Sequence, residues 1–330
     1  MMALRPRWAW IAWTSWAVLL AAAAAQPSRA GGEPPRDLNA VGPHCDRDCL
    51  TGILDQYLAG LVAHDPARVP FADRVKFTEN NVELRIGDGL WGTVSGIRHD
   101  ADLEFADPEW GEVGFYGVVE EHGNAAYLAL RLRVEHRKIS EVESIVNRKE
   151  PGPWADPATF KHDPAFFQTL PQGERTPRAR MMDLVNGYFS TLQLNDGKIF
   201  TQFDDTCARW ENGEQSASHS HDKNPFNRLS CGEQFKLGFY RWDTRVRDRG
   251  FLLVDEARGL VMARTFIDHA GILTDYTLTN GEKRVSPVTS PHTWCVLELF
   301  KIRSGKIFRI EAVFIGVPYS MPSPWVRYDR

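Results

Sequence analysis

The segment from Met181 to Gly213, MMDLVNGYFSTLQLNDGKIFTQFDDTCARWENG, has a counterpart earlier in the chain. The counterpart is LTGILDQYLAGLVAHDPARVPFADRVKFTENN, from Leu50 to Asn81. Repetition over such a length in a chain of 330 residues indicates two copies of one domain. The matched pairs are Tyr57 with Tyr188 and Asp65 with Asp196, 131 residues apart, and Phe71 with Phe203, Asp73 with Asp205, Glu79 with Glu211 and Asn80 with Asn212, 132 residues apart.

The chain begins with the pattern of a secretory signal peptide. Its first seven residues carry two arginines and no acid, and Trp8–Ala25 is almost wholly apolar and ends in alanines. A Pro- and Gly-rich stretch follows, as is typical of a leader that is cleaved. We expect cleavage near Ala25 or Ala30, export to the periplasm or the extracellular space, and no stable membrane span after cleavage. An uncleaved anchor is the alternative, because the apolar run is nearly long enough to cross a bilayer.

The amino-acid composition argues against one class of binding partner, nucleic acid. The chain has 39 Lys and Arg residues against 43 Asp and Glu, which gives a net charge of −4. Cleavage after Ala30 removes three arginines and no acid, so the net charge of the remainder becomes −7. An acidic, aromatic-rich chain is poorly suited to bind nucleic acid. The remaining chain, about 300 residues, is long enough for two domains of ordinary size.

Five cysteines in an exported chain allow disulfides but cannot all pair. Cys45 and Cys49 precede or open the first helix, whereas Cys207, Cys231 and Cys295 lie in the second copy. We predict a Cys207–Cys231 disulfide. A thiol nucleophile at Cys207 is the alternative, which the pattern favours less because no histidine lies beside it.

The first copy, residues 45–147, is predicted to place helices before strands. Apolar residues recur at helical spacing over 48–64, and His64-Asp65-Pro66 ends this helix. A strand begins near Val75, and a glycine-rich loop or hairpin follows at 87–96. Helices followed by an antiparallel meander indicate an α+β fold. The meander strands are expected at 113–121, 125–135 and 138–147.

The second copy, residues 178–316, follows a Pro-rich linker at 148–177 and precedes a tail at 317–330. It opens with a predicted helix at 178–194. We match its strands 251–257 and 260–268 to 117–122 and 125–133, so that the turn Ala257-Arg258-Gly259 stands for His122-Gly123-Asn124. An insertion from His269 to His292 has no equivalent in the first copy. The last strands lie at 294–302 and 306–315, where KIFRIEAVF matches KISEVESIV and Glu311 falls on Glu143.

Both copies resemble the nuclear transport factor 2-like superfamily, which includes the SnoaL-like cyclases, scytalone dehydratase and ketosteroid isomerase. The resemblance rests on the order of parts: a helix, an HDP or NDG break, FADR or FDDT, a strand, and a meander that ends near GKI. It implies two cone-shaped, curved antiparallel sheets, each wrapped round N-terminal helices and enclosing an apolar pocket. It also implies that the copies pack as an intramolecular pseudo-dimer.

The ketosteroid isomerase pattern implies catalytic residues in the second copy. Tyr188 falls on the helix tyrosine, Glu211 on the carboxylate base, and Glu298 on the protonated carboxyl that stabilises an enolate. The first copy has Tyr57 and Glu79 but Leu130 at the third position, so it is the weaker candidate. The base is Glu where the isomerase has Asp, so steroid chemistry does not carry over.

The resemblance therefore implies an exported, cofactor-independent isomerase or lyase (a dehydratase) acting on a small, hydrophobic, cyclic or aromatic carbonyl compound. Two glutamates in one apolar pocket titrate apart, so Glu211 should be ionised and Glu298 neutral. A non-catalytic binding protein and a structural interaction module are the alternatives, because this fold hosts all three. The enzyme and the binding protein can be distinguished by whether Tyr188, Glu211 and Glu298 converge in one pocket, because the proposed catalysis requires it.

Each of these residues also has a structural interpretation. An inward tyrosine is often core, and glutamates beside asparagine are often turn residues. Glu298 alternates with leucines and could face solvent. We further predict that His292 is a proton donor, since histidine titrates near neutral pH. The predicted ligand-binding residues are Tyr57, Glu79, Trp210 and Asn212.

The sequence Ser218-His219-Ser220-His221-Asp222 could supply metal ligands, because His-x-His followed by Asp is a feasible zinc or copper pattern. A polar loop exposed to solvent is the interpretation that we favour, since no further ligand is evident nearby in the sequence. We therefore predict no metal site.

Overall fold

The computed structural model describes residues 45–149 and 154–326. The predicted signal peptide and the final four residues of the predicted tail lie outside these ranges. The described residues belong to one compact unit. Within them, no helix combines the length and apolar character needed to cross a membrane.

The first half of the molecule packs helix α1 (Arg47–Val62) against a mixed sheet. The strand order is β2-β1-β7-β6-β5-β3, with β4 also paired to β5 and with β1 parallel to β7. Asp46 caps α1 by accepting a hydrogen bond from the backbone N–H of Cys49. The strands are β1 (Phe71–Glu79), β2 (Val82–Glu83), β3 (Val94–Ile97), β4 (Leu103–Asp107), β5 (Glu112–Glu121), β6 (Asn124–Glu135) and β7 (Lys138–Arg148); short 3₁₀ helices lie at η1 (Pro66–Arg68), η2 (Gly89–Gly92) and η3 (His99–Ala101).

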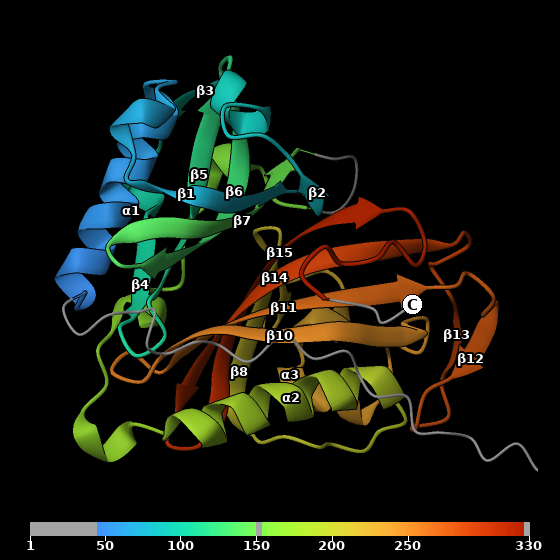
Figure 1. Cartoon of the computed structure of the whole chain (residues 1–330). Coiled ribbons are helices and arrows are strands. Elements are labelled where there is room, and N and C mark those ends of the chain that lie inside the picture. The colour runs from blue at the N-terminus through green and yellow to red at the C-terminus, as the bar shows by residue number, and fades with distance from the viewer. Residues whose placement is uncertain (1–44, 150–153, 327–330) are drawn as a thin grey trace, which may run out of the picture. The chain divides into compact units, whose positions relative to one another are not determined.

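The second half packs helix α2 (Arg178–Leu194) along β10 (Figure 1). Its sheet has the order β10-β11-β14-β15-β8-β9, with β15 parallel to β8. Its elements are β8 (Phe203–Glu211), β9 (Glu214–Ala217), η7 (Pro225–Arg228), α3 (Cys231–Lys236), β10 (Arg245–Asp255), β11 (Leu260–His269), β14 (His292–Arg303) and β15 (Lys306–Val317), and a separate pair of strands is formed by β12 (Asp275–Thr277) and β13 (Lys283–Val285).

The strand orders confirm an α+β fold and correct two details of the prediction. Each sheet is mixed, not wholly antiparallel, because its first long strand runs parallel to its last. The predicted match between the strands of the two halves is also wrong by one strand. Residues 260–268 of β11 were matched to β6, but β11 occupies the place of β5, and β14 occupies the place of β6. The segment with β12 and β13 therefore lengthens the turn that His122 and Gly123 make in the first half. The sequence match failed because alternating apolar strands resemble one another in any register.

The linker is packed against the sheets over its described part, residues 154–177. Asp156 and Asp163 each accept a hydrogen bond from a backbone N–H two residues later and so begin short 3₁₀ helices at prolines. Phe160 and Phe166 are buried in a core cluster that includes residues of both sheets. The 3₁₀ helices are η4 (Pro157–Thr159), η5 (Pro164–Phe167) and η6 (Gln172–Glu174).

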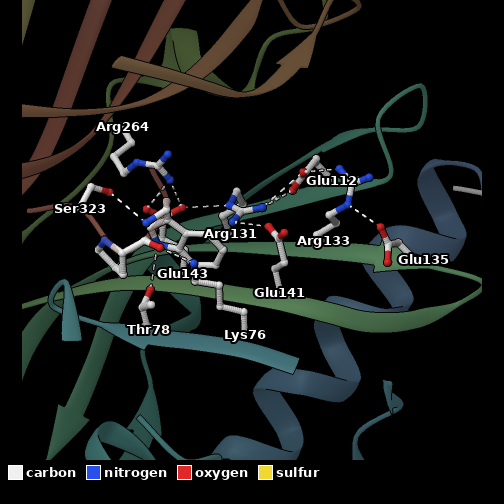
Figure 2. A network of polar contacts seen from close by, with 12 residues as sticks. Lys76, Thr78, Glu112, Arg131, Arg133, Glu135, Glu141, Glu143, Arg264 and Ser323 are labelled. Atoms are coloured by element: carbon white, nitrogen blue, oxygen red, sulfur yellow. Dashed lines mark hydrogen bonds and ion pairs between the residues drawn. The ribbon is translucent and has the colours of Figure 1, made fainter. Parts of the chain in front are cut away.

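Buried polar contacts join the two sheets. Arg264 on β11 donates to both carboxylate oxygens of Glu143 on β7, at 3.0 and 2.9 Å, and Arg131 donates to Glu143 at 3.1 Å (Figure 2). The side-chain amide of Asn147 donates to the carbonyl of Phe314 on β15 at 2.8 Å. Charged groups buried in this way are tolerated because they are paired and hydrogen-bonded.

Candidate active site

The second half contains a cavity of about 460 Å³. Many of its lining residues are aromatic, and the polar groups that reach it come from α2, β8, β9, η7 with its N-cap, β14 and the segment between α3 and β10. An apolar pocket with a few convergent polar groups is the usual form of a small-molecule site. The aromatic lining residues are Trp154, Tyr188, Phe226, Phe239, Tyr240, Trp242, Trp294 and Phe314.

Tyr188 and Glu298 meet at this wall. The Tyr188 hydroxyl donates to Glu298 Oε1 at 2.9 Å, although the residues are 110 positions apart, and each is only 3 % exposed. Edge-on contacts with Phe235 and Phe300, at ring-centroid distances of 5.4 and 5.0 Å, hold the tyrosine ring. The alternative that Glu298 faces solvent is therefore wrong.

The protonation of this pair follows from its burial. Desolvation raises the pKa of Glu298 to about 8, although the Tyr188 hydrogen bond and the nearby Arg209 charge act to lower it and Glu211 acts to raise it. Desolvation also raises the pKa of Tyr188 far above its ordinary value. Both groups are therefore neutral at pH 7, so Glu298 carries an O–H that can donate a hydrogen bond.

Glu211 lines the same cavity and faces a buried arginine. Alternation along β8 puts Arg209 and Glu211 on one face, and Arg209 Nε lies 3.5 Å from Glu211 Oε1. The guanidinium also donates to Ser216 Oγ at 3.1 Å, to Gln234 Oε1 at 2.9 Å and to the Tyr240 hydroxyl. Burial opposes the charge of Arg209, but the surrounding groups, Glu211 first among them, outweigh it and raise the pKa. Glu211 is 23 % exposed, so it is the more solvated of the two glutamates.

His292 also lines the cavity, as the predicted proton donor should. Its ring stacks on His269 with the centroids 4.5 Å apart, and Nδ1 lies 3.0 Å from the Ser290 carbonyl. Behind it, His269 Nε2 lies 2.9 Å from Asp243 Oδ1. Asp243 reaches the cavity wall as well, and burial raises the pKa of its carboxyl against the lowering influence of His269.

Trp210 and Asn212, predicted to bind ligand, do not line this cavity. Strand alternation turns Trp210 to the opposite face of β8 from Glu211, where it lines a separate open groove. Asn212 takes a left-handed φ of 43° and clamps β15, since its side chain accepts from the Phe314 N–H at 2.9 Å and donates to the Phe314 carbonyl at 3.1 Å. The structure therefore separates Trp210 and Asn212 from the cavity that Tyr188 and Glu298 line, and their ligand-binding roles stay predictions.

In the first half the interior beside Tyr57 and Glu79 is filled. The recess lined by Tyr57 and Glu79 is too small to admit a water molecule. Trp91, which is 2 % exposed, packs edge-on against Tyr57 with the centroids 5.5 Å apart. The Glu79 carboxylate accepts the Leu90 N–H at 2.7 Å and lies 3.5 Å from an Arg148 nitrogen. Tyr57 and Glu79 therefore pack in the core of the first half beside a filled recess, and their role in binding a ligand stays a prediction.

Two disulfides occur in the described chain. Cys207 on β8 is bonded to Cys231 at the start of α3, which is the pairing that the sequence predicts. The alternative of a thiol nucleophile at Cys207 is wrong for this reason. The second disulfide joins Cys45 to Cys49, and Cys295 is a buried thiol.

Comparison with known families locates a shared domain but names no activity. A family described as a domain of unknown function, DUF8021, matches residues 174–314. The match begins just before α2 and ends within β15, so it contains Tyr188, Glu211, Glu298 and every cavity-lining residue except Trp154. No curated protein matches the chain.

Several polar groups of the cavity were not predicted from the sequence, among them Arg209 and Asp243. Arg209 could have been found, because it precedes Glu211 by two positions, and residues two apart share one face wherever they lie on one strand, as these do on β8. Asp243 gave no signal, since it lies in an irregular segment between α3 and β10 where no periodicity fixes a direction.

Proposed function

We propose that this protein is an exported acid/base enzyme of the nuclear transport factor 2-like type, an isomerase or lyase that acts on a small cyclic or aromatic carbonyl compound in the cavity of the second half. The single observation that carries the proposal is the buried Tyr188–Glu298 pair beside Glu211 at one aromatic cavity. Support for the fold type comes from the strand order, which is the same in both sheets, and from the parallel pairing of the first long strand with the last.

The chemistry begins with proton abstraction. Glu211, as a carboxylate, would take a proton from the carbon next to the carbonyl, and the electron pair would move onto the carbonyl oxygen. Glu298, neutral because burial raises its pKa to about 8, would donate its O–H to that oxygen. Tyr188 donates to the other oxygen of the same carboxyl, which fixes its orientation.

The enolate can then react in two ways. In an isomerase, Glu211 returns the proton to a different carbon of the conjugated system. In a lyase, the enolate expels a leaving group from the β carbon, and His292 is placed at the cavity wall to protonate that group. Arg209, which is buried, cationic and adjacent, would stabilise negative charge in either case.

Export is part of the proposal. The two disulfides support it, because such bonds persist in oxidising compartments outside the cytosol.

The direct test is exchange of the α proton. The tag-free chain is incubated in D₂O with a panel of cyclohexanones, cyclohexenones, tetralones and chromanones, and deuterium incorporation is followed by NMR. We expect exchange above background for at least one class, and loss of that exchange in Glu211→Gln. Ligand binding is followed in parallel by quenching of tryptophan fluorescence, since Trp154, Trp242 and Trp294 line the cavity. Binding without exchange in the wild type would identify a binding protein and overturn the enzymatic proposal.

A further inference from the structure

Three potential metal ligands converge on the segment that follows the cavity strand β8. Glu214 on β9 and His219 and Asp222 in the following loop bring their ligand atoms within 4.8 Å of one another. His219 Nδ1 lies 3.2 Å from Asp222 Oδ2. We propose that Glu214, His219 and Asp222 bind a first-row transition-metal dication such as Zn²⁺.

The imidazole nitrogen that faces the cluster is weakly paired. His219 Nδ1 is shielded from solvent, and its contact with Asp222 Oδ2 at 3.2 Å lacks the geometry of a hydrogen bond. A shielded polar nitrogen that is poorly satisfied costs free energy, and a cation bound by both side chains would remove that cost. The adjacent His221 is exposed and is not in the cluster. The structure therefore replaces one member of the His-x-His pattern with Glu214, which lies five residues before His219 on the preceding strand.

The ligands sit on a restrained segment. The Cys207–Cys231 disulfide closes the chain on both sides of it. The backbone N–H of His219 donates to the Asn227 carbonyl at 2.8 Å, which fixes the position of the histidine. The carboxylate of Asp222 accepts from the Asn227 side chain at 3.1 Å, so it is oriented by a neighbouring group. Groups that hydrogen-bond to metal ligands without touching the metal hold those ligands in place and strengthen metal binding.

The donor set selects the class of metal. One imidazole and two carboxylates suit zinc and similar first-row dications, whereas calcium and magnesium prefer oxygen ligands alone. Two carboxylates with a neutral histidine would balance the charge of a dication. Three protein ligands leave room for water or another ligand in a four-coordinate site. Glu214 also lines the cavity, so the proposed site adjoins the candidate active site.

Binding is tested without reference to activity. The tag-free, chelator-treated protein is titrated with ZnCl₂ by isothermal calorimetry, and the melting temperature is measured with and without the metal. We expect one Zn²⁺ per chain and a higher melting temperature with metal. His219→Ala and Asp222→Asn should each weaken binding by at least about tenfold. His221→Ala is the matched control and should leave the affinity unchanged, and MgCl₂ should give no comparable heat.

Circular dichroism establishes that each variant is folded, and Asp222→Asn tests the site should His219→Ala fail to fold. The Zn²⁺ proposal is overturned if the wild type binds no Zn²⁺, or if His221→Ala weakens binding as much as His219→Ala. It is equally overturned if binding disappears only in His292→Ala, because this would place the metal at the stacked histidines of the cavity wall. These outcomes are independent of the exchange assay, since the metal could bind whether or not Glu211 abstracts a proton.

Discussion

In the first half of the molecule the side chain of Trp91 occupies the space beside Tyr57, whereas in the second half the space beside Tyr188 is open to a cavity of about 460 Å³. The two sheets have the same strand order, so the backbone topology does not cause this difference. The cause lies in the segment that follows the second strand of each sheet. In the first half it is short and turns Trp91 inward on η2.

In the second half the corresponding segment is longer and contains η7 and α3. The Cys207–Cys231 disulfide ties α3 to β8. Phe226, Phe239 and Trp242 from this segment line the cavity wall and do not fill it. The segment at this position thus fills the interior in the first half and lines a cavity in the second, so at this position only the second half has room for a ligand.

The third predicted catalytic position also differs between the halves in a way that fits a filled interior in the first and an open one in the second. Leu130 on β6 is opposite Ser144, and Glu298 on β14 is opposite Ala312. A leucine suits a filled interior, and a buried carboxyl needs a partner such as Tyr188. The comparison predicts that acid/base chemistry belongs to the second half alone.

The largest expected effect separates the two matched glutamates. Glu211→Gln removes the base and should lower the rate of α-proton exchange by about 10²- to 10⁴-fold. Glu79→Gln changes the equivalent residue in the filled half, so it should leave that rate unchanged and only lower stability, because Glu79 binds the Leu90 N–H and contacts Arg148. The rates are measured by NMR in D₂O. Equal loss in both variants would show that the division of labour between the halves is wrong.

The second effect concerns Trp91, which fills the interior of the first half beside Tyr57. Trp91→Ala deletes a large side chain from a close-packed interior and should lower the free energy of unfolding by about 3–5 kcal/mol. Trp294→Ala is the matched control, since Trp294 is only partly buried and borders a space that is already open. Its cost should be smaller. Urea unfolding of both variants measures the difference. Indole should stabilise Trp91→Ala if the deletion leaves a cavity. If Trp91→Ala costs no more stability than Trp294→Ala and indole does not stabilise it, Trp91 does not fill the interior of the first half.

A third effect tests whether Glu298 acts as a hydrogen-bond donor. Glu298→Ala removes the donor and should lower the exchange rate by about 10²- to 10³-fold. Glu298→Gln keeps a donor of similar shape and can still accept from Tyr188, so it should retain far more activity. The two rates are compared in one assay. If both variants exchange at the wild-type rate, Glu298 has no part in the chemistry.

The sequence predicted some of these features for identifiable reasons. The helices were visible because their apolar spacing and caps are local, and α2 was predicted at 178–194, as observed. Tyr188 and Glu298 lie 110 residues apart, so their contact could be expected only from the resemblance to a known fold. The hollow or filled state of each interior could not be read from the sequence. It depends on how side chains of irregular segments fill a volume, and such segments carry no periodic signal.

The strand match failed for a related reason. The turn at Ala257-Arg258-Gly259 and the turn at His122-Gly123 both join alternating apolar strands, and nothing local distinguishes them. Hydrogen-bonded pairing distinguishes them, because β11 lies beside β10 and β14 just as β5 lies beside β3 and β6. Pairing between distant strands is a property of the folded chain.

The last expected effect, small for each single pH unit, is a pH dependence of stability that belongs to the second half. Burial raises the pKa of Glu298 from its ordinary value of 4.5 to about 8 in the folded protein. Between these values the folded state holds a proton that the unfolded state has released, so rising pH favours unfolding. The loss should be about 1 kcal/mol per pH unit and should level off above pH 8, where the folded protein has released the proton as well.

Glu298→Gln cannot titrate, so the difference in unfolding free energy between wild type and this variant isolates the effect from all other groups. Urea unfolding at pH 5, 6, 7 and 8 measures it, and the Leu130→Gln variant shows how an uncharged amide behaves in the filled half. A constant difference between wild type and Glu298→Gln across this range would mean that Glu298 is already ionised in the folded protein, and the hydrogen-bond donor that the mechanism requires would then be absent.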